Sequence, residues 1–225
     1  MKPILIIVPS KGRPNKIDDF FKTWRETTEG FSDVLTVLDD DDPTLSKYSN
    51  YYDIKKDIDK GGTFAQACNR AFRKYPNYKY YFVVSDDHRI RTKGWEKLFM
   101  KKIEKNGGKG VAYGNDLLQG EKLATSAFIS GNIFRALGFV TPPTLIHMFT
   151  DKFWTDLGSE LGKLFYFPDV IVEHIHFSVG KSKNDKWYKR VNNQKIYNHD
   201  LKMYEEWKKK EMKKDLKKIK LYKGA

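Results

Sequence analysis

The sequence predicts an α/β protein built on a mixed, mostly parallel sheet flanked by helices. Segments typical of buried strands alternate with segments of helical spacing, in the order strand, helix, strand, helix, strand. Residues 80–84 form a continuous aromatic and β-branched run, as expected for a strand buried on both faces. The chain has 225 residues, of which 40% are hydrophobic, so it can bury a substantial core and is not a disordered chain.

Each predicted element follows from its apolar pattern and its boundary residues. In the first half of the chain, strands are expected at residues 4–8, 34–38 and 80–84, with 51–58 a weaker candidate. Helices there are expected from residue 15 or 16 to 28 and over 64–75. In the second half, helices are expected over 94–105, from 131 for a few residues, and over 151–164. The remaining strands are expected at 111–113, 123–130 and 165–177.

The composition changes after Gly180. Residues 181–225 are rich in lysine, but apolar residues still recur at roughly helical spacing. We therefore expect a domain of residues 1–180 and a basic helical C-terminal extension, residues 181–225, packed on it. The net charge of +13 suggests a polyanionic partner such as nucleic acid or an anionic membrane surface, although solubility explains the same charge.

The single cysteine and the N-terminal residues indicate the compartment. Cys68 alone cannot form a disulfide framework or a thiolate metal cluster, so a reducing compartment is expected. The apolar run at residues 4–8 is too short for a signal peptide or a membrane span. No transmembrane segment is predicted, and we expect a cytoplasmic protein.

Polar residues follow three predicted strands at their carboxyl ends. The groups are Ser10 to Arg13, Asp39 to Asp42, and Asp86, Asp87 and His88. Because ligands of open α/β sheets bind outside the carboxyl ends of the strands, we expect a site where these groups meet. An Asp-Asp pair after a strand is also a common turn or helix cap, so a purely structural role stays open.

Oxygen and nitrogen donors that lie this close together can hold a divalent cation, and through it a diphosphate. Asp86, Asp87 or His88 would supply one side of the coordination. His174 and His176 alternate onto one face of the last predicted strand and would supply the other. A histidine in a strand is more often packed in a core, so both interpretations of these two histidines stay open.

The order of these motifs resembles GT-A fold glycosyltransferases of the family 2 type, from about residue 4 to residue 181. In that family a Pro-Ser or Pro-Thr turn ends the first strand, an acid that reads the base ends the second, and a Gly…Ala…Asn segment leads to the Asp-x-Asp metal motif. The matching residues here are Pro9, Ser10 and Arg13, then Asp39 or Asp40, then Gly62, Ala65 and Asn69, and finally Ser85-Asp86-Asp87-His88. The last motif departs from the family pattern, since Asp87 or His88 replaces its final carboxylate.

The resemblance implies an inverting hexosyltransferase that uses Mn2+ or Mg2+ and a UDP-sugar donor. The donor-binding residues it implies are Pro9, Ser10, Arg13, Asp39, Asp40, Gly62, Asn69 and Asp86, and the metal ligands are Asp87, His88, His174 and His176. The family's catalytic base is an acid on the acceptor side, often in a Glu-Asp pair at a helix start. Thr150-Asp151 occupies that place, so Asp151 is the expected base, with a helix cap as its other interpretation.

In its high lysine content the sequence resembles phage-encoded glycosyltransferases that modify hydroxymethylated pyrimidines in DNA. Double-stranded DNA carrying 5-hydroxymethylpyrimidine bases is therefore the expected acceptor, in the cytoplasm of the host cell. The lysines expected to contact it are Lys181, Lys183, Lys208 and Lys209. A surface glycan or a lipid-linked acceptor is the alternative. A non-enzymatic nucleic-acid-binding protein would explain the charge but not the acidic strand ends, and a sugar nucleotidyltransferase would share the fold but needs a Gly-rich run that is missing.

Overall fold

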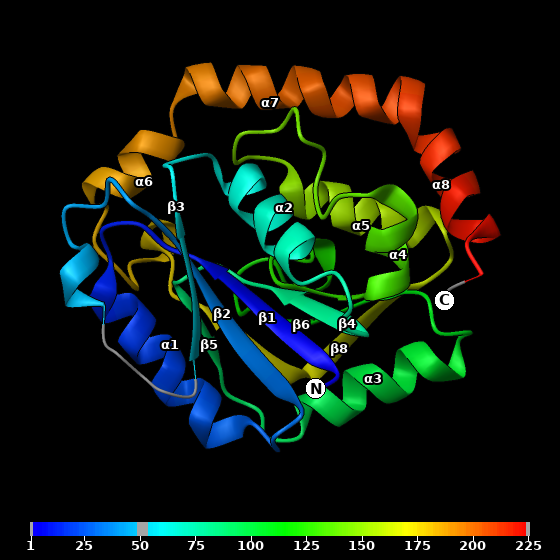
Figure 1. Ribbon diagram of the computed structural model, residues 1–225, viewed down its shortest axis with the longest axis horizontal. Helices are drawn as coiled ribbons and strands as arrows, with labels where there is room; N and C mark the ends of the chain where they lie inside the picture. The colour runs from blue at the N-terminus through cyan, green and yellow to red at the C-terminus, as the bar shows by residue number, and fades with distance from the viewer. Residues whose placement is uncertain (1, 49–53, 224–225) are drawn as a thin grey trace.

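A computed structural model describes residues 2–48 and 54–223 of the chain. Within these residues, eight strands form one sheet in the order β3-β2-β1-β4-β7-β6-β8-β5 (Figure 1). The strands are β1 (Ile4–Pro9), β2 (Ser32–Asp39), β3 (Ile54–Asp59), β4 (Tyr80–Val83), β5 (His88–Ile90), β6 (Val111–Asn115), β7 (Ala127–Ser130) and β8 (Leu164–His174).

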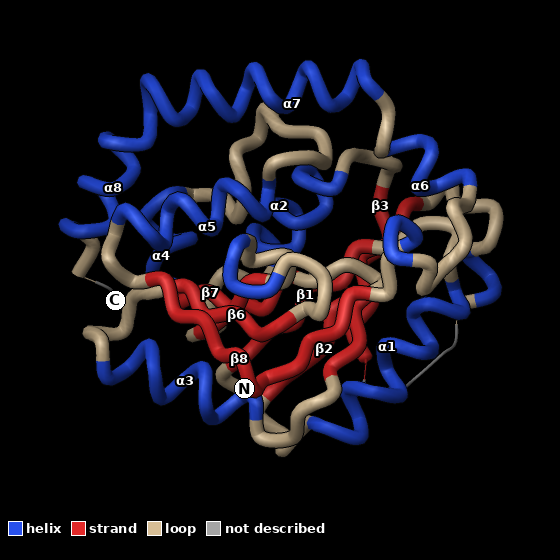
Figure 2. Tube along the Cα trace, turned by 180° about the vertical axis from the view of Figure 1, so that it is seen from behind, coloured by secondary structure: helices blue, strands red, loops and turns tan. Residues whose placement is uncertain are grey.

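Helices cover both faces of the sheet (Figure 2). One face carries α1 (Pro14–Thr27) and α3 (Trp95–Lys105). The other carries α2 (Phe64–Lys74), α4 (Gly131–Leu137), α5 (Thr150–Glu160), α7 (Gln194–Glu206) and α8 (Met212–Leu221). A π-helical turn, Trp207–Glu211, joins α7 to α8, and α6 (Lys186–Val191) precedes α7. Short 3-10 turns lie at Leu45–Lys47, Gly120–Lys122 and Phe177–Val179.

The strand directions bring distant segments to one edge of the sheet. β1 pairs in parallel with β2 and β4, and β2 pairs in parallel with β3, so the carboxyl ends of these four strands lie together. β7 is antiparallel to both β4 and β6, and β6 is parallel to β8. β8 therefore runs in the same direction as β4 and delivers His174 to the same edge.

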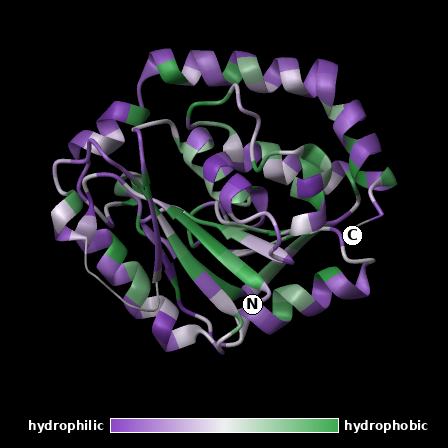
Figure 3. Cartoon of the chain, in the orientation of Figure 1, coloured by the Kyte–Doolittle hydropathy of each residue, from purple (hydrophilic) through white to green (hydrophobic). Residues whose placement is uncertain are grey.

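The side chains of the central strands alternate between two cores, as the pleat requires. Leu5 and Ile7 of β1 pack with residues of α2, whereas Ile4, Ile6 and Val8 pack with residues of α1. A strand that is covered on both faces needs apolar residues at every position, which explains the unbroken apolar runs of β1 and β4. Figure 3 shows these hydrophobic strands at the centre of the molecule.

Several predicted boundaries were wrong. The helix expected to run to residue 164 ends at Glu160, and Gly162 follows it in the left-handed region at φ 65°. The strand expected over 123–130 is restricted to β7, since the N–H groups of Ala124 and Thr125 donate to Thr155 Oγ1 and the Leu123 carbonyl instead of to a neighbouring strand. β5 was not predicted, because three residues carry no periodicity. The weak candidate at 51–58 corresponds to β3, and residues 49–53 lie outside the described part of the chain.

The lysine-rich segment after Gly180 is largely helical and runs across the α2, α4 and α5 side of the molecule (Figure 1). Its apolar residues Tyr204, Trp207 and Ile219 are buried in the same core as α4 and α5. Lys109 caps the end of α8 by donating from Nζ to the carbonyls of Ile219 and Tyr222. The division of the chain at residue 180 stays a prediction. Among the described residues, none of the helices has the length and apolar character needed to cross a bilayer.

Candidate active site

The loop after β1 and the acidic turn after β4 are joined by direct side-chain contacts. Ser10 Oγ donates to Asp86 Oδ2 at 2.7 Å, and Arg13 Nη1 donates to Asp86 Oδ1 at 3.2 Å. Asp86 is thus directed toward the first loop, and its neighbour Asp87 points to the histidines. The two adjacent acids therefore serve different parts of the site.

Asp87, His88 and His174 form one cluster. The β5–β8 pairing places His88 opposite His174, and the two imidazole rings stack with their centroids 4.3 Å apart. Asp87 Oδ1 lies 3.6 Å from His88 Nδ1 and 3.4 Å from His174 Nε2. One candidate ligand atom from each residue lies within 4.8 Å of the others. The structure therefore brings together three of the four predicted metal ligands.

His176, the fourth, lies beside this cluster but outside the group of three. β8 ends at His174, so the alternation expected over 165–177 stops there, and His176 caps the following 3-10 turn. Its Nδ1 lies 2.7 Å from Ser178 Oγ, and its ring centroid is 5.0 Å from that of His174. A ligand role for His176 stays a prediction.

The donor atoms of the cluster fit a divalent cation. Asp87 Oδ1, the atom that faces both histidines, is buried and lacks a hydrogen-bond partner among the described residues, which is costly for a polar atom without a ligand. Burial, together with the neighbouring His174, lowers the pKa of His88 to about 3, so its ring is neutral and keeps a lone pair. Burial alone would raise the pKa of Asp87, but the contacts with His174 and His88 hold it well below its usual range. One carboxylate and two imidazoles suit Mn2+ better than Mg2+.

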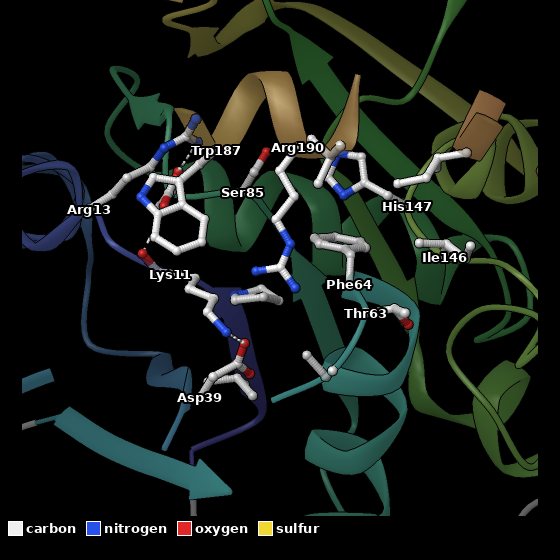
Figure 4. A pocket seen from close by; sticks show the side chains of 18 residues that line it. Lys11, Arg13, Asp39, Thr63, Phe64, Ser85, Ile146, His147, Trp187 and Arg190 are labelled. Carbon is white, nitrogen blue, oxygen red and sulfur yellow. Dashed lines mark hydrogen bonds and ion pairs between the residues drawn. The ribbon is translucent and has the colours of Figure 1, made fainter. Parts of the chain in front are cut away.

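A cavity of about 250 Å³ lies where the loop after β1, the end of β2 and the start of α2 meet, beneath α6 (Figure 4). Of the residues expected to bind the donor, those that line it are Pro9, Ser10, Arg13, Asp39, Gly62 and Asp86. Lys11 Nζ contacts Asp39 Oδ2 at 3.0 Å at the cavity wall. Asp40 is exposed and is not part of the lining, so Asp39 is the acid at the end of β2 that faces the cavity.

Asn69 does not face this cavity. Its amide nitrogen donates to the carbonyl of Thr141 at 2.9 Å, and its oxygen accepts from the N–H groups of Val140 and Thr141. Both ends of the amide therefore hold the segment before α5, and Asn69 supports the fold at this point instead of contacting the donor cavity.

A second cavity of about 210 Å³ adjoins the first and shares Arg13, Phe64, Ser85, His147 and Val191 with it. The candidate base and the metal cluster both open into this cavity, whose lining includes Asp151, Asp87, His174 and His176.

Asp151 lies in the first turn of α5, two positions after Phe149. Phe149 precedes the helix in the left-handed region at φ 64°, a conformation that is costly for a residue with a bulky side chain. Asp151 Oδ1 accepts from the N–H of Lys152 at 2.7 Å. Burial raises the pKa of Asp151, which suits a group that must accept a proton.

The C-terminal segment contributes residues to the site that sequence reasoning missed. Asp185 caps α6 and accepts a forked pair of bonds from Arg13, at 3.0 and 2.8 Å. Tyr188 donates its hydroxyl to Asp87 Oδ2 at 2.5 Å. Trp187 and Arg190 reach from α6 into the first cavity (Figure 4). The available signal was the Trp-Tyr pair behind a capping aspartate in a lysine-rich stretch.

His147 and Asp200 were missed as well. His147 lines both cavities, and burial lowers its pKa to about 4, so it is a neutral hydrogen-bonding group between them.

Of the lysines expected to bind a polyanion, Lys181 pairs with Glu173 and Lys208 pairs with Asp156, each at 2.7 Å. Lys183 and Lys209 are exposed.

Comparison with solved structures identifies the fold. No protein-family model matches the sequence, and no curated protein does. S. aureus TarS, residues 1–349, is similar with a TM-score of 0.59 at 13% identity, covering 93% of this chain and 73% of that chain. The same protein in complex with UDP-GlcNAc gives 0.57 at 13% identity, with the same coverage of 93% and 73%.

The mannosyltransferase PcManGT from Pyrobaculum calidifontis, in complex with GDP-Man and Mn2+, gives a TM-score of 0.60 at 11% identity, covering 99% of this chain and 76% of that chain. At such identities the similarity establishes the fold. The GT-A fold class expected from the sequence, a mixed sheet flanked by helices, is confirmed.

Proposed function

We propose that the protein is a metal-dependent glycosyltransferase that moves a sugar from a nucleotide-sugar donor, a UDP-sugar, to an acceptor hydroxyl. One observation carries the proposal: Asp151, Asp87 and His174 line a single cavity that adjoins the cavity at the ends of β1 and β2, and His88 stacks on His174 beside it. A glycosyl transfer needs these parts, which are a nucleotide site, a charge-neutralising centre and a base, in contact with one another. The ligands of the similar structures, UDP-GlcNAc and GDP-Man with Mn2+, are of the same chemical kind.

The nucleotide would occupy the first cavity. Asp39 would accept hydrogen bonds from the base or ribose at one end, and the cations of the loop after β1, Lys11 and Arg13, would face the diphosphate. Arg190 adds a further cation from the α6 side. Asp87, His88 and His174 would hold Mn2+, which would offset charge on the leaving diphosphate.

Asp151 would act as the base from the acceptor side. Its carboxylate would take the proton of the acceptor hydroxyl while that oxygen forms a bond to the anomeric carbon and the bond from that carbon to the diphosphate breaks. The elevated pKa that burial gives Asp151 favours this proton transfer. A single displacement of this kind inverts the anomeric configuration.

For the acceptor, we propose a 5-hydroxymethylpyrimidine base in double-stranded DNA, which would place the enzyme in the cytoplasm of a host cell. The support is the surface of the C-terminal helices. Val191 of α6 and Ile196 of α7 line the first cavity, and exposed lysines follow from α7 onward, among them Lys202, Lys209, Lys213, Lys217 and Lys220. A row of cations that leads away from the site suits a linear chain of phosphates.

The experiment is a transfer assay with radiolabelled UDP-sugars, Mn2+ and three acceptors: DNA with hydroxymethylated bases, unmodified DNA, and glycans with lipid-linked sugars. Label in hydroxymethylated DNA alone, with a binding constant that falls steeply with salt, is the expected result. Label in glycan or lipid alone would remove the DNA proposal and leave the enzyme. Neither transfer nor UDP release, with all donors tested, would reject the glycosyltransferase.

A further inference from the structure

We propose that Tyr188 is a positioning residue for the metal-binding carboxylate of Asp87, and that the docking of α6 therefore sets the affinity of the site for its cation. This inference rests on the metal site of the proposed function. It adds a role for the C-terminal segment, since Tyr188 lies 101 positions beyond Asp87 in sequence.

The two carboxylate oxygens of Asp87 have different surroundings. Tyr188 donates to Asp87 Oδ2 at 2.5 Å, while Oδ1 faces His88 and His174 and has no hydrogen-bond partner among the described residues. A carboxylate held at one oxygen cannot rotate its free oxygen away from the two imidazoles. Hydrogen bonds of this kind to ligating groups typically account for about 10- to 100-fold in metal affinity.

Tyr188 is itself held in a fixed place. Its side chain is buried, Lys16 Nζ donates to its hydroxyl at 2.8 Å, and the Arg13 guanidinium lies over its ring at 4.0 Å from the centroid. Phe177 packs against the same ring at 4.8 Å between centroids. The hydroxyl therefore reaches Asp87 only when α6 is seated on the loop after β1.

Two further contacts seat α6. Asp185 accepts the forked pair of bonds from Arg13, and the indole of Trp187 lies directly on Gly12. A methyl group added at Gly12 would lie 1.9 Å from Trp187 Nε1, so an alanine there must displace the Trp187 indole, which is one of these two contacts. Gly12→Ala is therefore a way to disturb the seating of α6 without changing Asp87, His88, His174 or Tyr188.

The chain offers a matched control for each variant. Gly108 has φ 71°, against 70° for Gly12, but nothing lies within 4 Å of a methyl group added there. Gly108→Ala therefore reproduces the backbone strain without the clash. Tyr204 donates its hydroxyl to Asp156, another buried tyrosine–carboxylate pair, so Tyr204→Phe removes a comparable bond away from the cluster.

The test is the affinity for Mn2+ alone, without nucleotide, measured by the loss of the free-ion electron paramagnetic resonance signal during titration. Tyr188→Phe is expected to raise the dissociation constant about 10- to 100-fold over wild type. Gly12→Ala is expected to raise it as well, and Tyr204→Phe and Gly108→Ala are expected to leave it unchanged. Circular dichroism spectra of all four variants check that they are folded, and the two lead variants reach the same contact by different substitutions, so one suffices if the other does not fold.

The outcomes distinguish a failure of the proposed metal site from a failure of the role of Tyr188. Absence of wild-type Mn2+ binding would overturn the metal site of the proposed function and this inference with it. Wild-type binding with an unchanged constant in Tyr188→Phe would overturn this inference alone. Tighter binding by Tyr188→Phe would also overturn it, because the hydroxyl would then be shown to occupy a position that the cation needs.

Discussion

The carboxylate of Asp200 on α7 accepts a hydrogen bond from the backbone N–H of His147 at 2.8 Å. It also accepts from the N–H groups of Ile146 and Met148, at 2.9 and 2.7 Å, and it is fully buried. The segment held in this way lines both cavities and leads through the left-handed Phe149 into Asp151. A single carboxylate of the C-terminal segment thus fixes the approach to the proposed base.

Asp200→Ala is expected to lower turnover about 10- to 100-fold, because three N–H groups lose their acceptor and the segment that leads to Asp151 is no longer held. The free energy of unfolding should fall by about 2–4 kcal/mol. Asp200→Asn keeps one carbonyl oxygen for the N–H groups of His147 and Met148 and should recover much of the turnover. Steady-state kinetics and urea denaturation measure both effects. Glu205→Ala, at an exposed acid of the same helix, is the control. Unchanged turnover in Asp200→Ala would contradict the positioning role.

Asp151→Asn is expected to lower the rate of transfer about 10²- to 10⁴-fold, as loss of a proton acceptor typically does, while binding of the nucleotide is retained. Because burial raises the Asp151 pKa, its charged form costs stability at neutral pH, so the variant should unfold no more easily than wild type at pH 7. Transfer kinetics, nucleotide titration and thermal unfolding test the three parts. Glu160→Gln, at the other end of α5, is the matched control. Full turnover by Asp151→Asn would show that the base is another group.

The pH dependence of turnover should report the same group. A base works only when deprotonated, so turnover should fall as the pH falls through the Asp151 pKa, and burial places that pKa above the ordinary value of about 3.9. The stability cost of the buried charge has the same origin: it is present above the raised pKa and disappears below it. Turnover at saturating donor and acceptor is measured against pH, with nucleotide binding followed over the same range. An acidic limb at the ordinary aspartate value would speak against the assignment.

Arg190→Ala is expected to raise the KM for the donor about tenfold, with a smaller effect on turnover, because a charged hydrogen bond to a phosphate is lost. Arg190 reaches into the first cavity, and its guanidinium carbon lies 5.7 Å from the centroid of the Trp187 ring (Figure 4). Isothermal titration with UDP and donor kinetics measure the change. The control is Lys189→Ala, which removes an exposed cation from the same helix. Equal donor affinity in Arg190→Ala and wild type would place the phosphates elsewhere.

The sequence was sufficient for the central strands and for the acidic edge, because a strand buried on both faces must be apolar throughout and its end is marked by the first charged residue. It associated Asp87 with His174 only as one of two interpretations, beside a packed core, since the pairing is made by β5, whose three residues carry no pattern. Asn69 matched a motif, but its amide holds the segment at Thr141.

Asp185, Tyr188 and Asp200 could not be predicted from the sequence, for a common physical reason. Each acts on a partner far away along the chain, as Asp185 does on Arg13, 172 positions earlier. A lone polar residue in a lysine-rich helix has the same appearance whether it faces water or a buried partner. Whether such a residue faces water or a buried partner depends on the path of the chain across the sheet, and sequence periodicity does not encode that path.

The order of the chain has a consequence for the protein's synthesis. Asp185, Tyr188 and Asp200 all follow β8, the last strand of the described sheet. When the last strand of this sheet has left the ribosome, the nascent chain still lacks the groups that hold Asp87 and the segment of His147. The growing polypeptide therefore has no complete candidate site until α6 and α7 have been translated and have folded back.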